Sequence, residues 1–217
     1  MKFSVKDPGS ALTHFIAMIL AAAAASPLIT KAALASGRYT AVAVGIFIIS
    51  MVLLYAASTA YHTFDISYKC NQLLKKIDHM MIFVLIAGTY TPVCLILLGN
   101  PEGYRLLALV WSIAAVGILI NAFWINCPKW FSSLIYIAMG WVCLTAIRAI
   151  IANLTTGAFC WLLAGGIIYT IGGVIYALKL PLFNARFKNF GSHELFHLFV
   201  MGGSFCHYIV MFRYVAV

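Results

Sequence analysis

The sequence predicts an all-α integral membrane protein, a seven-transmembrane helix bundle with its N-terminus in the cytoplasm and its C-terminus outside. Three observations predict this fold. The composition is more apolar than that of a soluble domain, seven apolar runs are long enough to cross a bilayer, and the basic residues are divided unevenly between the two sides that those runs create.

The composition favours the lipid bilayer as the solvent for most of the chain. Of the 217 residues, 64% are apolar and 9% are charged, whereas a soluble domain is nearer half apolar and a quarter charged. The net charge of +9 is spread over short segments between apolar runs, without a basic tail or a nucleic-acid motif. We therefore expect one membrane domain over residues 1–217, with membrane lipids and no nucleic acid as partners. The oligomeric state is left open.

Seven runs have the length of about 20 apolar residues that a helix needs to cross a bilayer. They lie at about residues 12–34, 40–62, 80–99, 105–125, 130–151, 158–178 and 195–215. The longest connections are expected at 63–79 and 179–194. The first run follows Lys2 and Lys6 and is long enough to span, so we expect an uncleaved first helix, with a cleaved signal peptide as the alternative.

The basic residues predict the orientation of the bundle. Seven spans place the two termini on opposite sides, and nine of the fourteen Lys and Arg residues fall on the side of the N-terminus. An excess of Lys and Arg marks the cytoplasmic side. The N-terminus is therefore predicted inside the cell, which disfavours a rhodopsin-like receptor, whose N-terminus lies outside.

Ionisable and polar residues at membrane depth are costly and mark candidate functional sites. Ser58 and His62 lie four residues apart near the end of the second run, so they share one helix face. Asp78 precedes the third run and falls at the same predicted level. Structural roles alone would leave Ser58 bonded to its own helix backbone and Asp78 beside the positive end of a helix.

The last run begins with a histidine pair that predicts a metal site. His193 and His197 lie four residues apart, so both imidazoles can reach one zinc ion. Unpaired polar groups in an apolar segment cost several kcal/mol, so the pair needs a partner. His62 supplies a third ligand from the same level, and Asp78 lies nearby. Three protein ligands leave one zinc position open for water, as in catalytic zinc sites.

The other histidines are less well placed for this site. His14 begins the first run, where it is expected to cap the helix or face the interface. His79 is expected to project from a different face of its helix than Asp78 does, and His207 lies about 15 Å along the axis from His197.

The string from His193 to His197 also matches the H-E-x-x-H pattern of zinc proteases, with Glu194 as the base. The extended form of that motif would need a histidine at Gly203. Only twenty residues follow His197, so a third ligand has to come from upstream.

These motifs resemble those of the hemolysin III family, which belongs with the progestin and adipoQ receptors and, more distantly, the alkaline ceramidases. The residues that carry the resemblance are Ser58, His62, Asp78, Ser192, His193 and His197. The stretches from Pro8 to His14 and from Ala87 to Pro92 are also similar to bacterial hemolysin III proteins. Glu194 is not part of the family motif, and the large N-terminal region of the adiponectin receptors is absent from this sequence.

The resemblance implies a seven-helix bundle in a cell membrane, and a bacterial plasma membrane in particular. It implies zinc held by the residues that match its histidines, His62, His193 and His197. It also implies that Asp78 holds the water on the zinc, with Ser58 as a nearby polar group.

Three functions follow as expectations. The first is a zinc-dependent hydrolase of a lipid amide or ester at the cytoplasmic membrane face, with Asp78 and Ser58 as its catalytic residues and Zn²⁺ as its cofactor. The second is a hemolysin-type membrane-damaging or pore-forming protein. The third is a membrane receptor or sensor in which zinc is structural and no reaction takes place.

Overall fold

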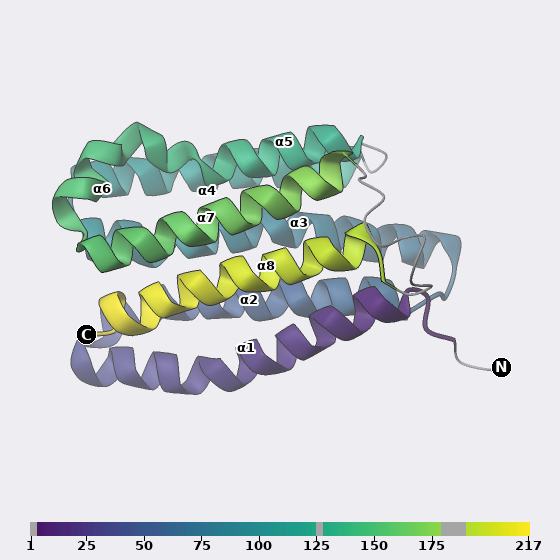
Figure 1. The fold of residues 1–217 in the computed structure, drawn as a ribbon, viewed down its shortest axis with the longest axis horizontal. Helices are drawn as coiled ribbons and strands as arrows, with labels where there is room; N and C mark the ends of the chain where they lie inside the picture. Colours follow the sequence, from purple (N-terminus) through teal and green to yellow (C-terminus); the bar gives the residue numbers. More distant parts are fainter. Residues whose placement is uncertain (1–3, 125–127, 179–189) are drawn as a thin grey trace.

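The structure, a computed structural model, describes residues 4–124, 128–178 and 190–217, and these form a bundle of long helices (Figure 1). The α-helices are α1 (Pro8–Ala35), α2 (Arg38–Thr63), α3 (Tyr68–Pro92), α4 (Pro101–Phe123), α5 (Lys129–Gly140), α6 (Ile147–Asn153), α7 (Thr156–Leu178) and α8 (Ser192–Val210). Two π-helical segments, η1 (Val93–Leu98) and η3 (Met211–Val215), continue α3 and α8, and a 3₁₀ segment, η2 (Val142–Ala146), precedes α6. Within the described residues, seven helical units are long and apolar enough to span a membrane, which confirms the predicted seven-helix bundle.

The third span differs most from its prediction. It was expected to begin near residue 80, but α3 begins at Tyr68, so the predicted connection at 63–79 is wrong over most of its length. Ser67 caps this helix by accepting a hydrogen bond from the Cys70 backbone N–H at 3.3 Å. The first turns of α3 carry polar side chains such as Asn71 and Lys75, so the apolar run begins only after the helix itself has begun. Most of the predicted connection at 179–194 lies outside the described residues, and its last residues already belong to α8.

The order of the helices in space brings the first two helices and the last helix together on one side of the bundle. Helix α2 packs between α1 and α3, α4 packs on α3, and α8 packs against α7 and α1. The N-terminus and the C-terminus lie at opposite ends of the bundle, as seven spans require (Figure 1). The end that holds the N-terminus is the one predicted to face the cytoplasm.

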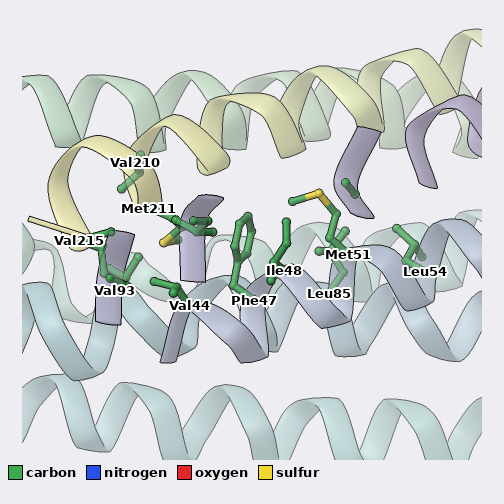
Figure 2. Close-up of a cluster of buried hydrophobic side chains, with 14 of the residues drawn as sticks. Val44, Phe47, Ile48, Met51, Leu54, Leu85, Val93, Val210, Met211 and Val215 are labelled. Atoms are coloured by element: carbon green, nitrogen blue, oxygen red, sulfur yellow. The ribbon is translucent and has the colours of Figure 1, made fainter. Parts of the chain in front are cut away.

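The buried apolar side chains form two clusters. The first cluster joins α1, α2, α8 and η3 and includes Phe47, Ile48 and Met211, all fully buried (Figure 2). The second cluster joins α3, α4, α5 and α6. In it the Phe83 ring lies against Gly117 of α4, at a place where any larger side chain would collide with the ring. Such close packing is what holds helices together in lipid, where burial from water contributes little.

A cavity of about 630 Å³ extends along the inside of the bundle. Residues of both clusters line it, including Leu54 and Leu85 of the first and Leu106 and Ile150 of the second. Its volume lies within the range typical of ligand sites in proteins.

Candidate metal centre

Three histidines from two distant parts of the chain meet at one end of this cavity. His62 ends α2, and His193 and His197 lie on the first turns of α8. One nitrogen from each ring lies within 4.8 Å of the other two. His62 and His197 are buried, whereas His193 is partly exposed. The structure therefore brings together the three predicted ligands in a group that could hold a metal ion.

The distances suit a tetrahedral metal. The Nε2 atoms of His62 and His193 lie 3.2 Å apart. Two zinc–nitrogen bonds of about 2.0–2.1 Å at a tetrahedral angle separate their nitrogens by about 3.3 Å. The ring centroid of His197 lies 4.6 Å from that of His193 and 5.3 Å from that of His62. The donor set consists of imidazoles, which zinc accepts readily and magnesium and calcium do not.

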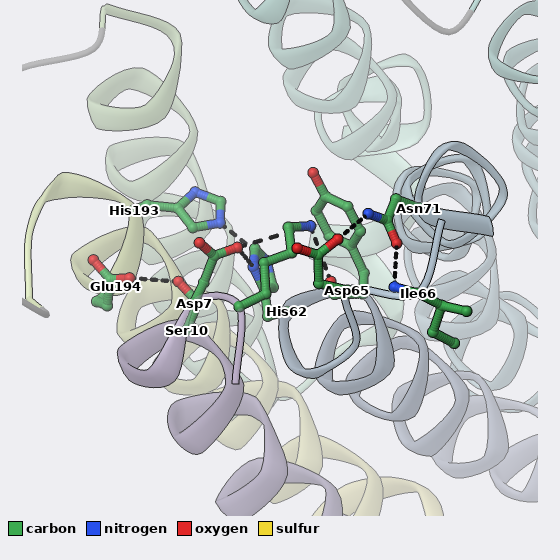
Figure 3. Close-up of polar contacts among 10 residues, drawn as sticks. Asp7, Ser10, His62, Asp65, Ile66, Asn71, His193 and Glu194 are labelled. Carbon is green, nitrogen blue, oxygen red and sulfur yellow. Dashed lines mark hydrogen bonds and ion pairs between the residues drawn. The ribbon is translucent and has the colours of Figure 1, made fainter. Parts of the chain in front are cut away.

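The segment before α1 fixes His62 in the tautomer that can bind a metal ion. The Asp7 backbone N–H donates to the His62 carbonyl at 2.9 Å, and the Asp7 carboxylate lies 3.0 Å from His62 Nδ1 (Figure 3). A carboxylate only accepts hydrogen bonds, so the proton of the neutral ring lies on Nδ1. The Nε2 lone pair is then free for a metal, which is the usual arrangement of a carboxylate behind a metal-binding histidine.

Helix α1 orients His197 in the same way. The Thr13 hydroxyl donates to the Ser10 carbonyl at 2.9 Å, which leaves its oxygen to accept a hydrogen bond from His197 Nδ1, 3.1 Å away. This contact puts the proton of His197 on Nδ1 and leaves its Nε2 lone pair unprotonated. Two of the three candidate ligands therefore have their tautomer set by residues of the N-terminal part of the chain.

His14 occupies a position that the sequence did not predict. It was expected to cap the first helix or face the interface, but it is only 3% exposed and lies inside the bundle. Its ring stacks on that of His197 with a centroid distance of 3.6 Å and an interplanar angle of 8°. On another side it meets Tyr55 edge-on at 5.0 Å. His14 thus covers one face of a candidate ligand without joining the three-histidine group.

Asp78 and Ser58 lie together in the wall of the same cavity. The Ser58 and Asp78 side chains are both buried. Ser58 lies one turn of α2 from His62, and Asp78 is not a member of the three-histidine group. His79 and His207 line the cavity as well, and both lie outside the group.

Glu194 caps the beginning of α8. One of its oxygens accepts a hydrogen bond from the Gly191 backbone N–H at 2.8 Å, and the other accepts from the Ser10 hydroxyl of α1 (Figure 3). Both contacts are structural, because they cap the helix and tie it to α1. The geometry therefore gives the glutamate of the H-E-x-x-H string a place in the fold and does not require it as a base.

Sequence reasoning missed Asp7, Thr13 and His14 as neighbours of the site. A signal for two of them was present, since Asp7, Ser10 and His14 are spaced by three and four residues and form a polar stripe at the start of an apolar helix. Nothing in the spacing alone shows that this stripe faces α2 and α8.

Comparison with known proteins matches almost the whole chain. The family described as "Haemolysin-III related" matches residues 4–208. "Hemolysin-3" of Bacillus cereus is 38% identical over 215 residues, which cover 99% of this chain and 94% of that protein. "Hemolysin-3 homolog" of Bacillus subtilis (strain 168) is 37% identical over 203 residues, with 93% and 91% covered.

A more distant relative is the "Adiponectin receptor protein" of Drosophila melanogaster, 26% identical over 219 residues, which cover 93% of this chain and 49% of that protein. Together with the seven spans, the bacterial relatives identify a multi-pass protein of the cell membrane. The extent and identity of these matches show that the chain belongs to the haemolysin-III-related family.

Proposed function

We propose that this protein is a zinc-dependent hydrolase that cleaves a lipid amide or ester at the cytoplasmic face of the membrane. The observation that carries the proposal is the convergence of three imidazoles at a cavity whose wall is mostly apolar and includes the buried Asp78 side chain. A site of this kind brings a polar reaction centre and an apolar chain-binding space into direct contact.

The three histidines fit zinc by ligand type, number and spacing. His62, His193 and His197 would hold the ion and leave one position for water. A zinc ion bound in this way lowers the pKa of its water to about 7 and polarises a carbonyl group.

Asp78 is the proposed general base. It is buried in the wall of the cavity that the three histidines also line, and it is not a member of their group. From this position the carboxylate would orient the attacking water, accept its proton and return the proton to the leaving amine or alcohol. Ser58 lines the same cavity and would donate its hydroxyl proton to the oxygen that becomes negative in the reaction.

The cavity favours a lipid as the substrate. Its wall is apolar over most of its length, with side chains such as Leu85, Ile137, Leu162 and Val200 below the histidines. An acyl chain placed there would bring its amide or ester group to the level of the metal centre, which is the boundary between chains and headgroups in the predicted orientation.

The test is turnover of a panel of lipid amides and esters by the purified, zinc-loaded protein. Asp78→Asn keeps the size of the side chain and should lower turnover by about 10²–10⁴-fold while the zinc content stays the same. Asp65→Asn is the matched control, because Asp65 is exposed and bonds only the nearby Asn71 in the α2–α3 turn. Absence of turnover with every lipid would overturn the proposal.

The same preparation separates this function from its rivals. The name of the Bacillus cereus relative, "Hemolysin-3", suggests membrane damage. Release of dye from liposomes that persists in Asp78→Asn and does not need a cleavable lipid would favour that function. A thermal stability that falls in His62→Ala, with no reaction in the unaltered protein, would favour a receptor or sensor stabilised by zinc.

A further inference from the structure

His14 of α1 lies flat against His197, one of the three candidate ligands of the metal centre. The two ring centroids are 3.6 Å apart and the ring planes differ by only 8°. The pairs among the candidate ligands are arranged differently, because their ring planes cross at 56°, 58° and 67°. His14 therefore contacts the metal centre through the face of its ring, whereas the three candidate ligands bring one nitrogen each to a shared place.

The parallel arrangement does not suit His14 as a fourth ligand. A zinc ion bound to His197 lies close to the plane of that ring, about 2.0–2.1 Å from its nitrogen. The His14 ring is parallel to that plane and a full stacking distance away from it. Neither nitrogen of His14 belongs to the three-histidine group, and neither has a hydrogen-bond partner among the described residues. Any contribution of His14 to the centre therefore comes from the ring itself.

The His14 ring is held in place by a second aromatic side chain. It is almost fully buried and meets the Tyr55 ring of α2 edge-on, with a centroid distance of 5.0 Å. Tyr55 is fixed in turn, because its hydroxyl donates to the Ser204 hydroxyl of α8 at 2.8 Å. Ser204 follows His197 by seven residues on the same helix. The contacts thus run from α8 through α2 and α1 back to the candidate ligand on α8, so that a fixed ring lies against His197.

Thr13 and His14 restrain His197 in two different ways. The Thr13 hydroxyl lies 3.1 Å from His197 Nδ1 and sets the tautomer of the ring. One hydrogen bond still allows the imidazole to tilt about the line that joins the two bonded atoms. Contact over the ring face opposes this tilt. Two neighbouring residues of α1 therefore hold the edge and the face of the same ring.

The stack becomes more favourable when a metal ion is bound. The ion draws electron density from His197 and leaves its ring partly positive. Positive charge is attracted to the face of an aromatic ring, and the attraction is stronger away from water. His14 is buried without hydrogen-bond partners among the described residues, so it is an uncharged ring that can play this part. A contact that is stronger in the metal-bound state raises the affinity for the metal.

We propose that His14 is a positioning residue of the metal centre, whose ring face fixes the plane of His197 and stabilises the charge that a bound ion places on it. The proposal rests on the metal site of the proposed function and not on its reaction. It requires that a change at His14 affects the binding of the ion more than the stability of the zinc-free protein.

The test measures zinc affinity of the purified protein by competition with a chelator, which needs no substrate. His14→Leu keeps a buried side chain of similar volume without an aromatic face and should weaken zinc binding by about 5–30-fold, the range that follows from one cation–π contact away from water. His14→Phe keeps an aromatic face without nitrogens and should restore most of the affinity. The melting temperatures of the two zinc-free variants should agree within about 4 °C, which separates a loss of zinc from a loss of packing.

His207→Leu is the matched control, since His207 is also buried and lines the same cavity, but it contacts the Tyr169 ring and lies outside the three-histidine group. It should bind zinc normally. Unchanged affinity in His14→Leu, an equal loss in His14→Phe, or the same loss in His207→Leu would overturn the positioning role. If the unaltered protein binds no zinc, this role and the proposed function fail together. Rescue by His14→Phe in a protein that turns over no lipid removes only the hydrolase.

Discussion

The two halves of the bundle differ in what they hold. Helices α1, α2 and α8 pack around fully buried side chains such as Phe47 and Val44. Together with the segment before α1, they carry every candidate ligand and the residues that orient two of them. In the other half, α5 ends at Gly140 and continues as a 3₁₀ segment without buried residues, and this half contributes mostly apolar wall to the cavity. Both halves contain fully buried side chains, so the first half is set apart by the polar site that its packing holds in place, where binding geometry has narrow tolerances.

The largest expected effect is the loss of the metal from the half formed by α1, α2 and α8. His193→Ala removes one of three ligands, and the purified protein should contain no bound zinc on elemental analysis. His79→Ala removes a histidine that lines the same cavity outside the group and should retain the metal. A full complement of zinc in His193→Ala would show that the three imidazoles do not form the site.

Two truncations compare a side chain of the buried core with one in the cavity wall. Phe47→Ala leaves a void in the half that holds the histidines and should lower the free energy of unfolding by about 3 kcal/mol. Leu163→Ala alters the cavity wall at a side chain that is 38% exposed and should cost less than about 1 kcal/mol. Denaturant unfolding in detergent measures both. Equal losses would mean that the cavity wall contributes as much to stability as the core around Phe47.

The orienting carboxylate gives a smaller effect on the site itself. Asp7→Ala leaves His62 free to rotate and to change tautomer, so zinc affinity should fall by about 10–100-fold in a competition assay with a chelator. Asp7→Asn keeps an acceptor oxygen, so its zinc affinity should lie between that of Asp7→Ala and that of the unaltered protein. Asp65→Ala, which removes an exposed carboxylate near the same end of the bundle, should bind zinc normally. An unchanged affinity in Asp7→Ala would contradict the orienting role.

The smallest effect is expected at Thr13. Thr13→Val keeps the shape of the side chain but removes the acceptor of His197 Nδ1, and zinc affinity should fall by less than about tenfold. Thr145→Val, on the 3₁₀ segment of the other half, removes a hydroxyl that bonds only the nearby Val142 carbonyl and should change nothing. If the two variants behave alike, the contact with His197 does not position that ring.

The sequence predicted the seven spans and the three converging histidines because both depend on patterns that local spacing displays. Apolar run length reports the bilayer, and a spacing of four on a helix brings His193 and His197 to one point. The beginning of α3 was missed because its polar first turns are helical without being apolar. The contacts of Asp7 and His14 were missed because they join positions that are about 50 and 180 residues apart, which only the packing of α1 decides.

The pairing of Lys6 and Asp7 with the end of α2 has a practical consequence for handling the protein. An extension ahead of Lys6 would begin beside the end of α2 that carries His62. A polyhistidine tag there would bring further imidazoles close to the candidate metal site. An affinity handle joined after Val217 would leave from the opposite end of the bundle, away from that site (Figure 1).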